Sequence, residues 1–505
     1  MKLVYSILIF ISLTTMTICR QHRQQLRSTD FFNQLFNAEN IYNEKELIGY
    51  KSIYNTILLD AKNAVDQEDD IYDKHKAIFN LLHDKYLKRY TGISYFSKLL
   101  KSGDYNCATA VTLYYLLCDD LGLRVNLYES PYHVYITVNS PENNEFIVEL
   151  TNPVDGFDFK PDEEDYITYL LDYKLITKKE YDETEKDKLY KKFISESHKI
   201  KPEKLLSIYY SNLATYKLLK NNTSEAYKLI KKAVSIMPDS ANIQEHDMIW
   251  SLQISNIETN TNALSAFLLE SMDSIPPSNE FIDALIKASS NAIYKNLNMN
   301  KFEMADSIYN KLCSVLPGEK LSEPVIGQLD IDVNRAKINS RVVRGEYEGA
   351  FTLAGNLFDR YRKNDSVLEI YIEVGNSYMK QLGFSGNFEK LMKVADTLFV
   401  KAPGVKSVKE TYALSSVMYV VNSGLYNSDA GRAEKILLDA NEKLPDNIMI
   451  KRALGMIYHE LAMAKIRKKD YSTAVKLLKK GLGYYPESKD LKHELKLTHD
   501  LLPKK

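Results

Sequence analysis

Between residues 60 and 160, the spacing of apolar residues changes from helical to strand-like. Apolar positions three and four residues apart predict a helix over residues 71–90. The almost continuously apolar run after Asn106 predicts a buried helix, which Asn106 caps and Gly122 ends. Polar residues 140–144 predict a turn between two alternating strands. We therefore expect helices followed by three strands, over residues 123–130, 133–138 and 146–151.

A second pattern recurs through residues 207–486. A small or apolar residue is followed by another seven positions later and, in most copies, by a proline five positions after that. Small residues allow two helices to approach closely, and proline ends a helix because it lacks a backbone donor. The pattern predicts consecutive helix hairpins that end 38 to 45 residues apart. The copies are Ala226/Ala233/Pro238, Leu264/Ser271/Pro276, Ala305/Leu312/Pro317, Ala350/Leu357/Arg362, Leu391/Leu398/Pro403, Ala433/Ala440/Pro445 and Ala474/Gly481/Pro486.

These repeats resemble the tetratricopeptide repeat, with Gly345, Gly386 and Lys469 where the turn between the two helices belongs. Each copy exceeds the usual ~34 residues by roughly seven, which implies lengthened helices or loops. The resemblance implies an all-α solenoid of about seven hairpins over residues 201–505. Such an array offers a surface for a protein or peptide partner. The alternative is an array that only holds the N-terminal domain in place.

The composition fits a folded protein of two or three domains, because 45% of the 505 residues are hydrophobic and 26% are charged. Few glycines (19) and prolines (14) favour long helices over many-stranded sheets. The formal net charge of −1 gives no overall attraction to nucleic acid or to an anionic membrane. We therefore expect neither nucleic acid nor a membrane as a partner. A retained N-terminal leader could still anchor the protein to a membrane.

Residues 1–19 have the pattern of a secretory signal peptide, with a lysine, an apolar stretch from Leu3 to Leu13 and a more polar end. The apolar stretch is shorter than the ~20 residues of a membrane-spanning helix. The alternatives, in order of preference, are cleavage before Arg20, lipidation at Cys19 and an uncleaved anchor. We therefore expect an exported protein, in the periplasm or outside the cell, with a membrane-anchored lipoprotein as the variant.

Three cysteines follow the leader, namely Cys107, Cys118 and Cys313. Cys107 and Cys118 belong to one predicted helix, where a rise of ~1.5 Å per residue separates them by ~16 Å. A disulfide needs Cα atoms within ~7 Å, so no bond between these two is expected. We expect Cys118 in the core and Cys313 packed inside a repeat. The histidines show no metal-ligand spacing, so neither a metal site nor a cofactor is predicted.

Cys107 is the candidate nucleophile because it falls in the first turn of its predicted helix. Unpaired N–H groups and the helix dipole favour a thiolate there and can hold an oxyanion. His133 begins one strand, and Glu149 lies near the end of its hairpin partner. We expect these two residues directly opposite each other, around a loop centred on Pro141. One face of the sheet would then present an imidazole with a carboxylate that orients it.

This order resembles the transglutaminase-like superfamily, which has a papain-like fold with a Cys at a helix start, a His on one strand and an Asp on the next. The best matches are Gly103–Ala110, Leu121–Leu123, Pro131–Val134 and Ile147–Thr151. The resemblance covers residues 70–160 and is closest to exported bacterial members with tetratricopeptide repeats downstream. It implies an α+β domain over residues 20–200, in which Cys107 is the nucleophile, His133 the base and Glu149 the orienting carboxylate. Glutamate stands where aspartate is usual, and Asn152 is the alternative third residue.

Two functions of different classes follow. The first is an exported cysteine-dependent hydrolase or acyltransferase acting on peptide or amide bonds, whose repeats recruit a protein or peptide. Cys107 would attack a carbonyl, His133 would move the proton, and water or an amine would resolve the thioester. The second is a non-catalytic binding protein that retains the fold. The charged stretch 180–192, which lacks proline and glycine, predicts a solvated helix between the two parts.

Overall fold

In a computed structural model, the chain forms two compact units, Met1–Ala288 and Ser289–Lys505. The structure describes residues 30–131, 133–140, 145–160, 163–172, 176–273, 276, 278–423 and 429–502. The expected leader and residues 141–144 of the expected turn lie outside these ranges. None of the described helices has the length and apolar content that a bilayer crossing demands.

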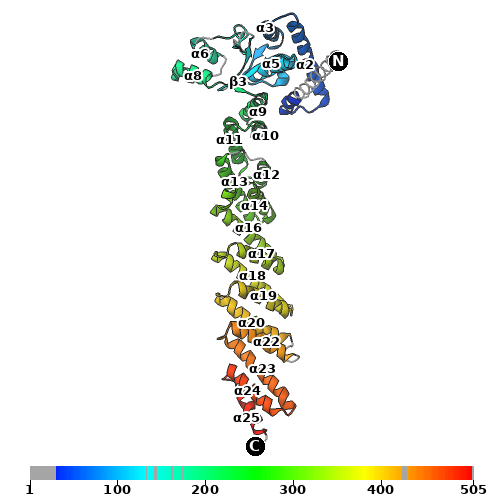
Figure 1. Ribbon diagram of the computed structural model, residues 1–505, viewed down its shortest axis with the longest axis vertical. Coiled ribbons are helices and arrows are strands. Elements are labelled where there is room, and N and C mark those ends of the chain that lie inside the picture. The colour runs from blue at the N-terminus through cyan, green and yellow to red at the C-terminus, as the bar shows by residue number, and fades with distance from the viewer. Residues whose placement is uncertain are drawn as a thin grey trace, which may run out of the picture. The chain divides into compact units, whose positions relative to one another are not determined.

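The first unit begins with helices that pack around a small antiparallel sheet (Figure 1). The strand order is β5-β4-β3-β6, with β3 at Asn126–Ser130, β4 at His133–Asn139, β5 at Glu145–Val148 and β6 at His198–Ile200. Two further short strands, β1 (Arg89–Tyr90) and β2 (Asp104–Tyr105), pair in parallel. The preceding helices are residues 30–38, α2 (Glu44–Val65), α3 (Ile71–Leu81), the π-helix η1 (Leu82–Tyr86), α4 (Phe96–Ser102) and α5 (Cys107–Asp120).

The helix expected over residues 71–90 is shorter than predicted. Helical structure ends at Tyr86, because Leu87 is extended and Arg89–Tyr90 pair with Asp104–Tyr105 instead. Leu87 is buried, which explains why it continues the apolar spacing although it lies outside the helix. Tertiary pairing with a distant segment thus overrides the local periodicity.

The buried helix after Asn106 is confirmed as α5. The Asn106 side chain accepts the Thr109 N–H at 2.9 Å, and the Thr109 hydroxyl accepts the Asn106 N–H at 2.9 Å. This reciprocal capping box fixes Cys107 as the first helical residue. Gly122, with φ of +73°, ends the helix in the left-handed region. α5 packs against β4, so the elements that carry Cys107 and His133 are neighbours.

The register of β4 and β5 is shifted by two residues from the expected one. Ile136 lies opposite Val148 and Thr137 opposite Ile147, so His133 and Glu149 are not directly opposite. β5 also ends at Val148, earlier than expected. Beyond Val148, the chain forms a loop in place of the expected end of the strand. Val148 forms an isolated antiparallel bridge with Phe157, and the Glu149 N–H donates to the Gly156 carbonyl at 2.7 Å.

Three short helices connect β5 to β6. They are α6 (Glu163–Asp172), α7 (Lys178–Glu183) and α8 (Lys186–Ser195), which pack around buried Ile167, Leu170 and Leu189. The single solvated helix expected over residues 180–192 is divided between α7 and α8. The division falls at Thr184, whose backbone is extended.

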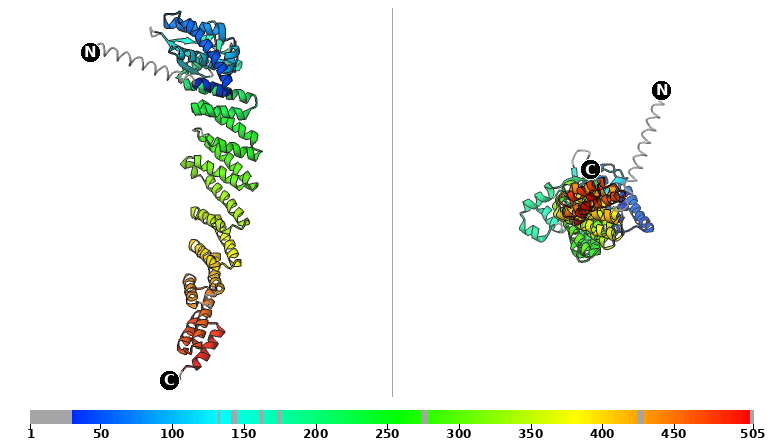
Figure 2. Two further views of the ribbon diagram at one scale, coloured as in Figure 1. Left: turned by 90° about the vertical axis from the view of Figure 1, so that its right-hand side faces the viewer. Right: turned by 90° about the horizontal axis from the view of Figure 1, so that it is seen from below.

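From Pro202 onward, the described chain is helical and forms consecutive helix pairs (Figure 2). The predicted all-α repeat region is confirmed, with seven pairs among the described residues. The pairs are α9 (Pro202–Leu219) with α10 (Thr223–Ile236), α11 (Ser240–Ile257) with α12 (Thr261–Ser271), α13 (Asn279–Asn298) with α14 (Phe302–Val315), α16 (Pro324–Val343) with α17 (Tyr347–Arg360), α18 (Asp365–Phe384) with α19 (Phe388–Lys401), α20 (Lys406–Asn422) with α22 (Ala430–Lys443), and α23 (Ile448–Arg467) with α24 (Tyr471–Tyr484). The remaining helices are α15 (Gly318–Leu321) and α25 (Lys489–Asp500).

The repeated small residues mark the second helix of each pair. In α10, for example, Ala226 and Ala233 are fully buried, and the helix ends two residues before Pro238. Apart from α12, the second helices have 14 residues each, whereas the first helices have 17 to 20. The extra length of the repeat therefore lies in its first helix.

The turns inside the helix pairs lie where the sequence predicts them. Gly345 and Gly386 have φ of 79° and 73°, and Lys469 adopts the same left-handed region with φ of 61°. Asn221 and Asn300 occupy the equivalent place, two residues after a first helix, with φ of 57°. Asparagine and glycine tolerate this conformation best, which explains their use at a tight helix-to-helix turn.

Candidate functional site

Cys107 occupies the N-terminus of α5, as predicted. It is half-buried and is a free cysteine. Of the first four N–H groups of the helix, that of Thr109 binds the Asn106 side chain and that of Ala110 binds the Asn106 carbonyl. No acceptor within the described ranges is assigned to the N–H groups of Cys107 and Ala108. Two backbone donors and the positive end of the helix dipole are therefore available beside the thiol.

His133 and Glu149 form a buried hydrogen-bonded pair. The Nε2 atom of His133 lies 2.7 Å from Oε2 of Glu149, and each side chain is at least 96% buried. The Glu149 side chain reaches diagonally across the hairpin, which brings together two residues that are not opposite in register. The predicted histidine–carboxylate partnership is therefore present, in a geometry that differs from the expected one.

Electrostatic coupling holds this pair in its charged form. Burial lowers the pKa of His133, but the Glu149 carboxylate and the Cys107 thiol outweigh burial and raise that pKa to about 10. Burial likewise raises the pKa of Glu149, but the His133 charge and bonds from Thr151 leave it lower than usual. Because Nε2 binds Glu149, Nδ1 is the ring nitrogen left for Cys107. Within the described part of the chain, this buried Nδ1 has no hydrogen-bond partner.

Thr151 and Gly156 fix the position of Glu149. The Thr151 N–H and hydroxyl donate to Oε1 of Glu149 at 3.0 and 2.6 Å, which leaves Oε2 for the imidazole. A Cβ atom on Gly156 would collide with the carbonyl oxygens of Glu149 and Asn152, so the loop requires glycine there. Asn152 itself accepts the N–H groups of Val154 and Asp155 with its side chain. The carboxylate that contacts His133 is therefore that of Glu149, and Asn152 shapes the loop.

Cys107 and His133 open into a cavity of about 890 Å³ within the first unit. One wall comes from the α5 start, β3, β4 and the chain near Gly92, and the other from α9 and α11 of the repeats. We call this cavity the cleft. Its repeat wall includes Lys204, Ser211, Thr215 and Glu245. The cleft thus places the candidate nucleophile opposite the first repeat helices.

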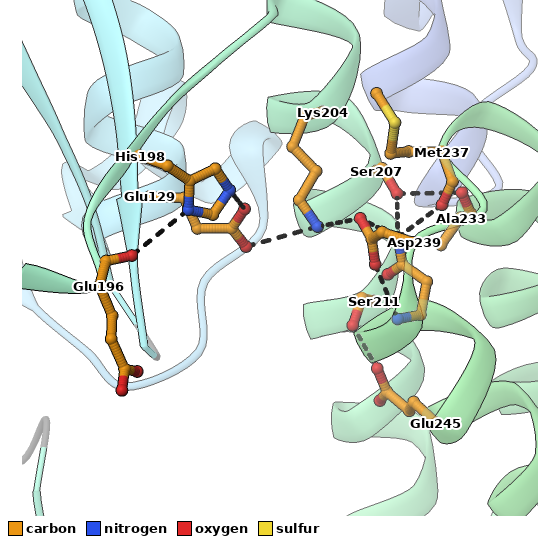
Figure 3. Close-up of polar contacts among 11 residues, drawn as sticks. Glu129, Glu196, His198, Lys204, Ser207, Ser211, Ala233, Met237, Asp239 and Glu245 are labelled. Carbon is orange, nitrogen blue, oxygen red and sulfur yellow. Dashed lines mark hydrogen bonds and ion pairs between the residues drawn. The ribbon is translucent and has the colours of Figure 1, made fainter. Parts of the chain in front are cut away.

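A buried lysine joins the two walls. Lys204 on α9 is 7% exposed, and its Nζ lies 2.5 Å from Asp239 Oδ2 and 3.4 Å from Glu129 Oε1 (Figure 3). Glu129 on β3 also lies 3.5 Å from His198 Nε2 on β6. Lys204 therefore links the sheet to the turn that precedes α11, and its charge is balanced by two carboxylates.

Cys118, Cys313, His75 and His83 are not among the residues that line the cleft. Cys118 is buried in α5, where burial raises the pKa of its thiol, and its sulfur lies 3.9 Å from Nδ1 of His75. Cys313 is half-buried in α14, inside a repeat as expected. Burial lowers the pKa of both His75 and His83 to about 4. Within the described ranges, no group of three or more His, Cys, Asp or Glu side chains is arranged to hold a metal ion.

Several functional contacts were not predicted from the sequence. Thr151, Gly156 and the repeat wall of the cleft are the main ones. Lys204, Ser211 and Thr215 follow one another at intervals of seven and four, so they share one face of α9. That spacing predicts a polar stripe along one face of an otherwise apolar helix. Nothing in the local sequence identifies Gly156 or the short strand β6.

Comparisons with known proteins add little to this geometry. No protein-family model and no curated protein matches the chain. Among solved structures, the tetratricopeptide repeat domain of P58(IPK) aligns with 11% identity and a TM-score of 0.18, over 58% of this chain and 88% of that one. A tetratricopeptide repeat protein from Parabacteroides merdae aligns with 13% identity and a TM-score of 0.17, over 58% and 98%.

Yeast Tom70 also aligns, with 13% identity and a TM-score of 0.17, over 95% of this chain and 93% of that one. At such identities and TM-scores, the alignments carry no argument about function. The assignment of helix-hairpin repeats rests on the helix pairs and turns described above.

Proposed function

We propose that this protein is a repeat-based scaffold that binds a protein or peptide, and that the bound chain enters the cleft beside Cys107. The proposal is supported by the consecutive helix pairs, whose side chains line one wall of the cleft. A binding surface built from stacked helix pairs suits an extended peptide. The scaffold function requires no chemistry at Cys107.

A second function, cysteine-dependent acyl transfer, is favoured by one observation. Cys107 at a helix N-terminus and the buried His133–Glu149 pair open into the same cleft. In this proposal the thiolate attacks a carbonyl carbon, and the N–H groups of Cys107 and Ala108 hold the oxyanion. The resemblance to transglutaminase-like proteins belongs to this proposal as well.

The charged His133–Glu149 pair determines which group donates the proton at each step of the proposed reaction. His133 carries the proton at the start, because its pKa is raised. It gives that proton to the leaving amine when the C–N bond breaks and the Cys107 thioester forms. Water or a second amine then attacks the thioester carbonyl and returns a proton to His133 as the thiolate leaves. Hydrolysis and transamidation differ only in this last nucleophile.

Trapping the intermediate tests the catalytic proposal. The purified protein is incubated with a mixture of cell-envelope peptides, quenched in acid and digested, and its cysteine-containing peptides are measured by mass spectrometry. A hydroxylamine-sensitive acyl adduct on Cys107, and none on Cys118 or Cys313, supports acyl transfer. Cys107→Ser, which preserves the side-chain size, is the control. Peptide binding without any adduct on Cys107 leaves the scaffold function alone.

Export is a separate proposal, because the leader lies outside the described residues. The motive is the short apolar stretch in residues 1–19. Mass measurement of the N-terminus of the protein purified from its native cells decides the matter. A mature chain that begins at Arg20 supports a cleaved signal peptide, and a lipid-modified Cys19 supports the lipoprotein alternative. An intact Met1 in a soluble cytosolic fraction contradicts export.

A further inference from the structure

The cleft carries an excess of acidic side chains. Its lining includes four carboxylate residues and one lysine, together with His133 and His198. The carboxylate residues are Glu129, Glu196, Asp239 and Glu245, and the lysine is Lys204. Even with His133 protonated, negative charge predominates. In a partly enclosed site, such an imbalance attracts cations more strongly than it would on an open surface.

Glu245 on α11 is a carboxylate of the cleft that neutral side chains hold in place. Both of its oxygens accept hydroxyl groups of α9, from Ser211 and, at 2.5 Å, from Thr215. Asp239 and Glu129, by contrast, already share Lys204. No cationic side chain of the described residues forms an ion pair with Glu245. Its charge is therefore oriented by two neutral donors, of which Figure 3 shows Ser211, and is not neutralised within the described part of the protein.

The opposite wall of the cleft contains a buried polar group that could bind a ligand. Ser130 is 2% exposed and His133 is 3% exposed, and both line the cleft. The Ser130 hydroxyl has no hydrogen-bond partner in the described part of the chain, whereas Nδ1 of His133 is the ring nitrogen left for Cys107. Leaving a buried polar group unpaired is unfavourable, so a buried hydroxyl without a partner calls for an explanation. A ligand that supplies an acceptor here would satisfy the Ser130 hydroxyl.

We propose that the cleft binds a peptide segment carrying a basic side chain, whose ammonium or guanidinium group pairs with Glu245 while a backbone carbonyl lies against Ser130 and His133. The basic side chain confers recognition and does not react. For the scaffold function, basic peptides are therefore the expected ligand class. For acyl transfer, the same contact gives a preference for basic residues near the acyl group, and this part rests on the proposed catalytic function. Binding itself does not depend on turnover.

Charged thiol reagents measure the potential at Cys107 directly. Trimethylammonioethyl and sulfonatoethyl methanethiosulfonate are of similar size and differ in the sign of their charge. We expect the cationic reagent to modify Cys107 about three- to tenfold faster than the anionic one, after correction for their rates with free cysteine. Added salt should reduce this preference. Equal rates, or a preference for the anion, would overturn the proposal.

Variants of Glu245 and of a control residue test whether Glu245 causes the faster reaction with the cationic reagent. Glu245→Gln should lower the rate ratio toward one, whereas Glu245→Asp should retain most of it. Glu203→Gln, which removes the same charge from an exposed position of α9 outside the cleft, should change little. If Glu203→Gln lowers the ratio as much as Glu245→Gln does, the effect is one of net charge, and the assignment to Glu245 is wrong.

Peptide protection tests the ligand class without requiring catalysis. The probes are acetyl-Ala-Lys-Ala-Lys-Ala-amide and its glutamate and glutamine counterparts, used to slow the reaction of Cys107 with iodoacetamide. We expect the lysine peptide alone to protect, and Glu245→Gln to abolish protection. Protection by all three peptides, or by none, contradicts a basic ligand, whereas a missing thioester in the trapping experiment would contradict only the catalytic proposal.

Discussion

His133 Nε2 and Glu149 Oε2 lie 2.7 Å apart in the interior of the first unit, although the strand register displaces the two residues from each other by two positions. The contact exists because Thr151 holds the second oxygen of the carboxylate. It sets the charge and the orientation of the imidazole that lies beside Cys107.

The charged state of the pair predicts a distinctive pH dependence. With its pKa raised to about 10, His133 contributes stability that is complete below its ordinary pKa of 6.5 and is lost as the pH rises through about 10. Glu149, with a lowered pKa, contributes stability that is present above its ordinary pKa of 4.5 and is lost as the pH falls through the folded value. The stability difference between the wild type and Glu149→Gln should therefore be greatest near pH 5–6.

Nuclear magnetic resonance of the imidazole carbons checks the assignment. His133 should remain protonated at pH 8, whereas the buried His75 and the half-buried His83, whose pKa values are lowered to about 4, should remain neutral down to pH 5. In Glu149→Gln the His133 signal should titrate at a much lower pH. A wild-type His133 that titrates near 6.5 would refute the charged pair.

A variant series separates the roles of the site residues. His133→Ala should slow the reaction of Cys107 with electrophiles more than Glu149→Gln does, because the carboxylate acts only through the imidazole. Asn152→Ala should leave that reactivity close to wild type, since its side chain binds Val154 and Asp155 N–H groups. A strong loss in Asn152→Ala with a silent Glu149→Gln would transfer the third role to Asn152.

Gly156 is predicted to be a positioning residue for Glu149. Gly156→Ala forces a Cβ atom against the carbonyls of Glu149 and Asn152, so we expect a loss of about 2 kcal/mol or more in the free energy of unfolding. The His133 resonance should move as well, because the carboxylate is displaced. Gly49→Ala in α2, where a Cβ meets nothing within 4 Å, is the control and should be neutral or slightly stabilising. Equal behaviour of the two variants would contradict the role of Gly156.

Lys204 is predicted to hold the sheet and the first repeats together. Lys204→Met removes the cation shared by Glu129 and Asp239, which are partly exposed and keep other partners, so the loss in the stability of the first unit should be about 1–3 kcal/mol. Hydrogen exchange should increase in β6 and at the start of α9. The triple variant Lys204→Met, Glu129→Gln, Asp239→Asn should recover part of the loss. A fully stable Lys204→Met would contradict this account.

The helix repeats were predictable because their signal is local and recurs. Small residues such as Ala226 and Ala233 face a neighbouring helix, and their spacing is the helical period itself. The capping box of Asn106 and the glycine stop at Gly122 are likewise properties of short segments. These features survive in the structure at the residues where the sequence places them.

The remaining parts depend on contacts between distant segments. The pairing of Arg89 with Asp104 ends the helix expected over residues 71–90, and no local signal reports it. β5 ends at Val148, where the chain enters a loop in which the Glu149 N–H donates to the Gly156 carbonyl, a contact beyond the hairpin itself. The cleft arises only when α9 and α11 pack near the sheet, so Glu245 could not be associated with Cys107 from the sequence.

The rate of Cys107 alkylation by iodoacetamide, measured residue by residue in the wild type and in His133→Ala, tests the central claim most directly. In the wild type at pH 7, the account predicts that Cys107 reacts at least about tenfold faster than Cys118 and Cys313. Burial raises the pKa of both other thiols, whereas Cys107 lies at a helix N-terminus beside His133 and opens into the cleft. His133→Ala should remove most of this advantage while leaving the rates of the other two unchanged. Equal and slow alkylation of Cys107 and Cys313, unaffected by His133→Ala, would contradict the claim that Cys107, His133 and Glu149 form one functional site.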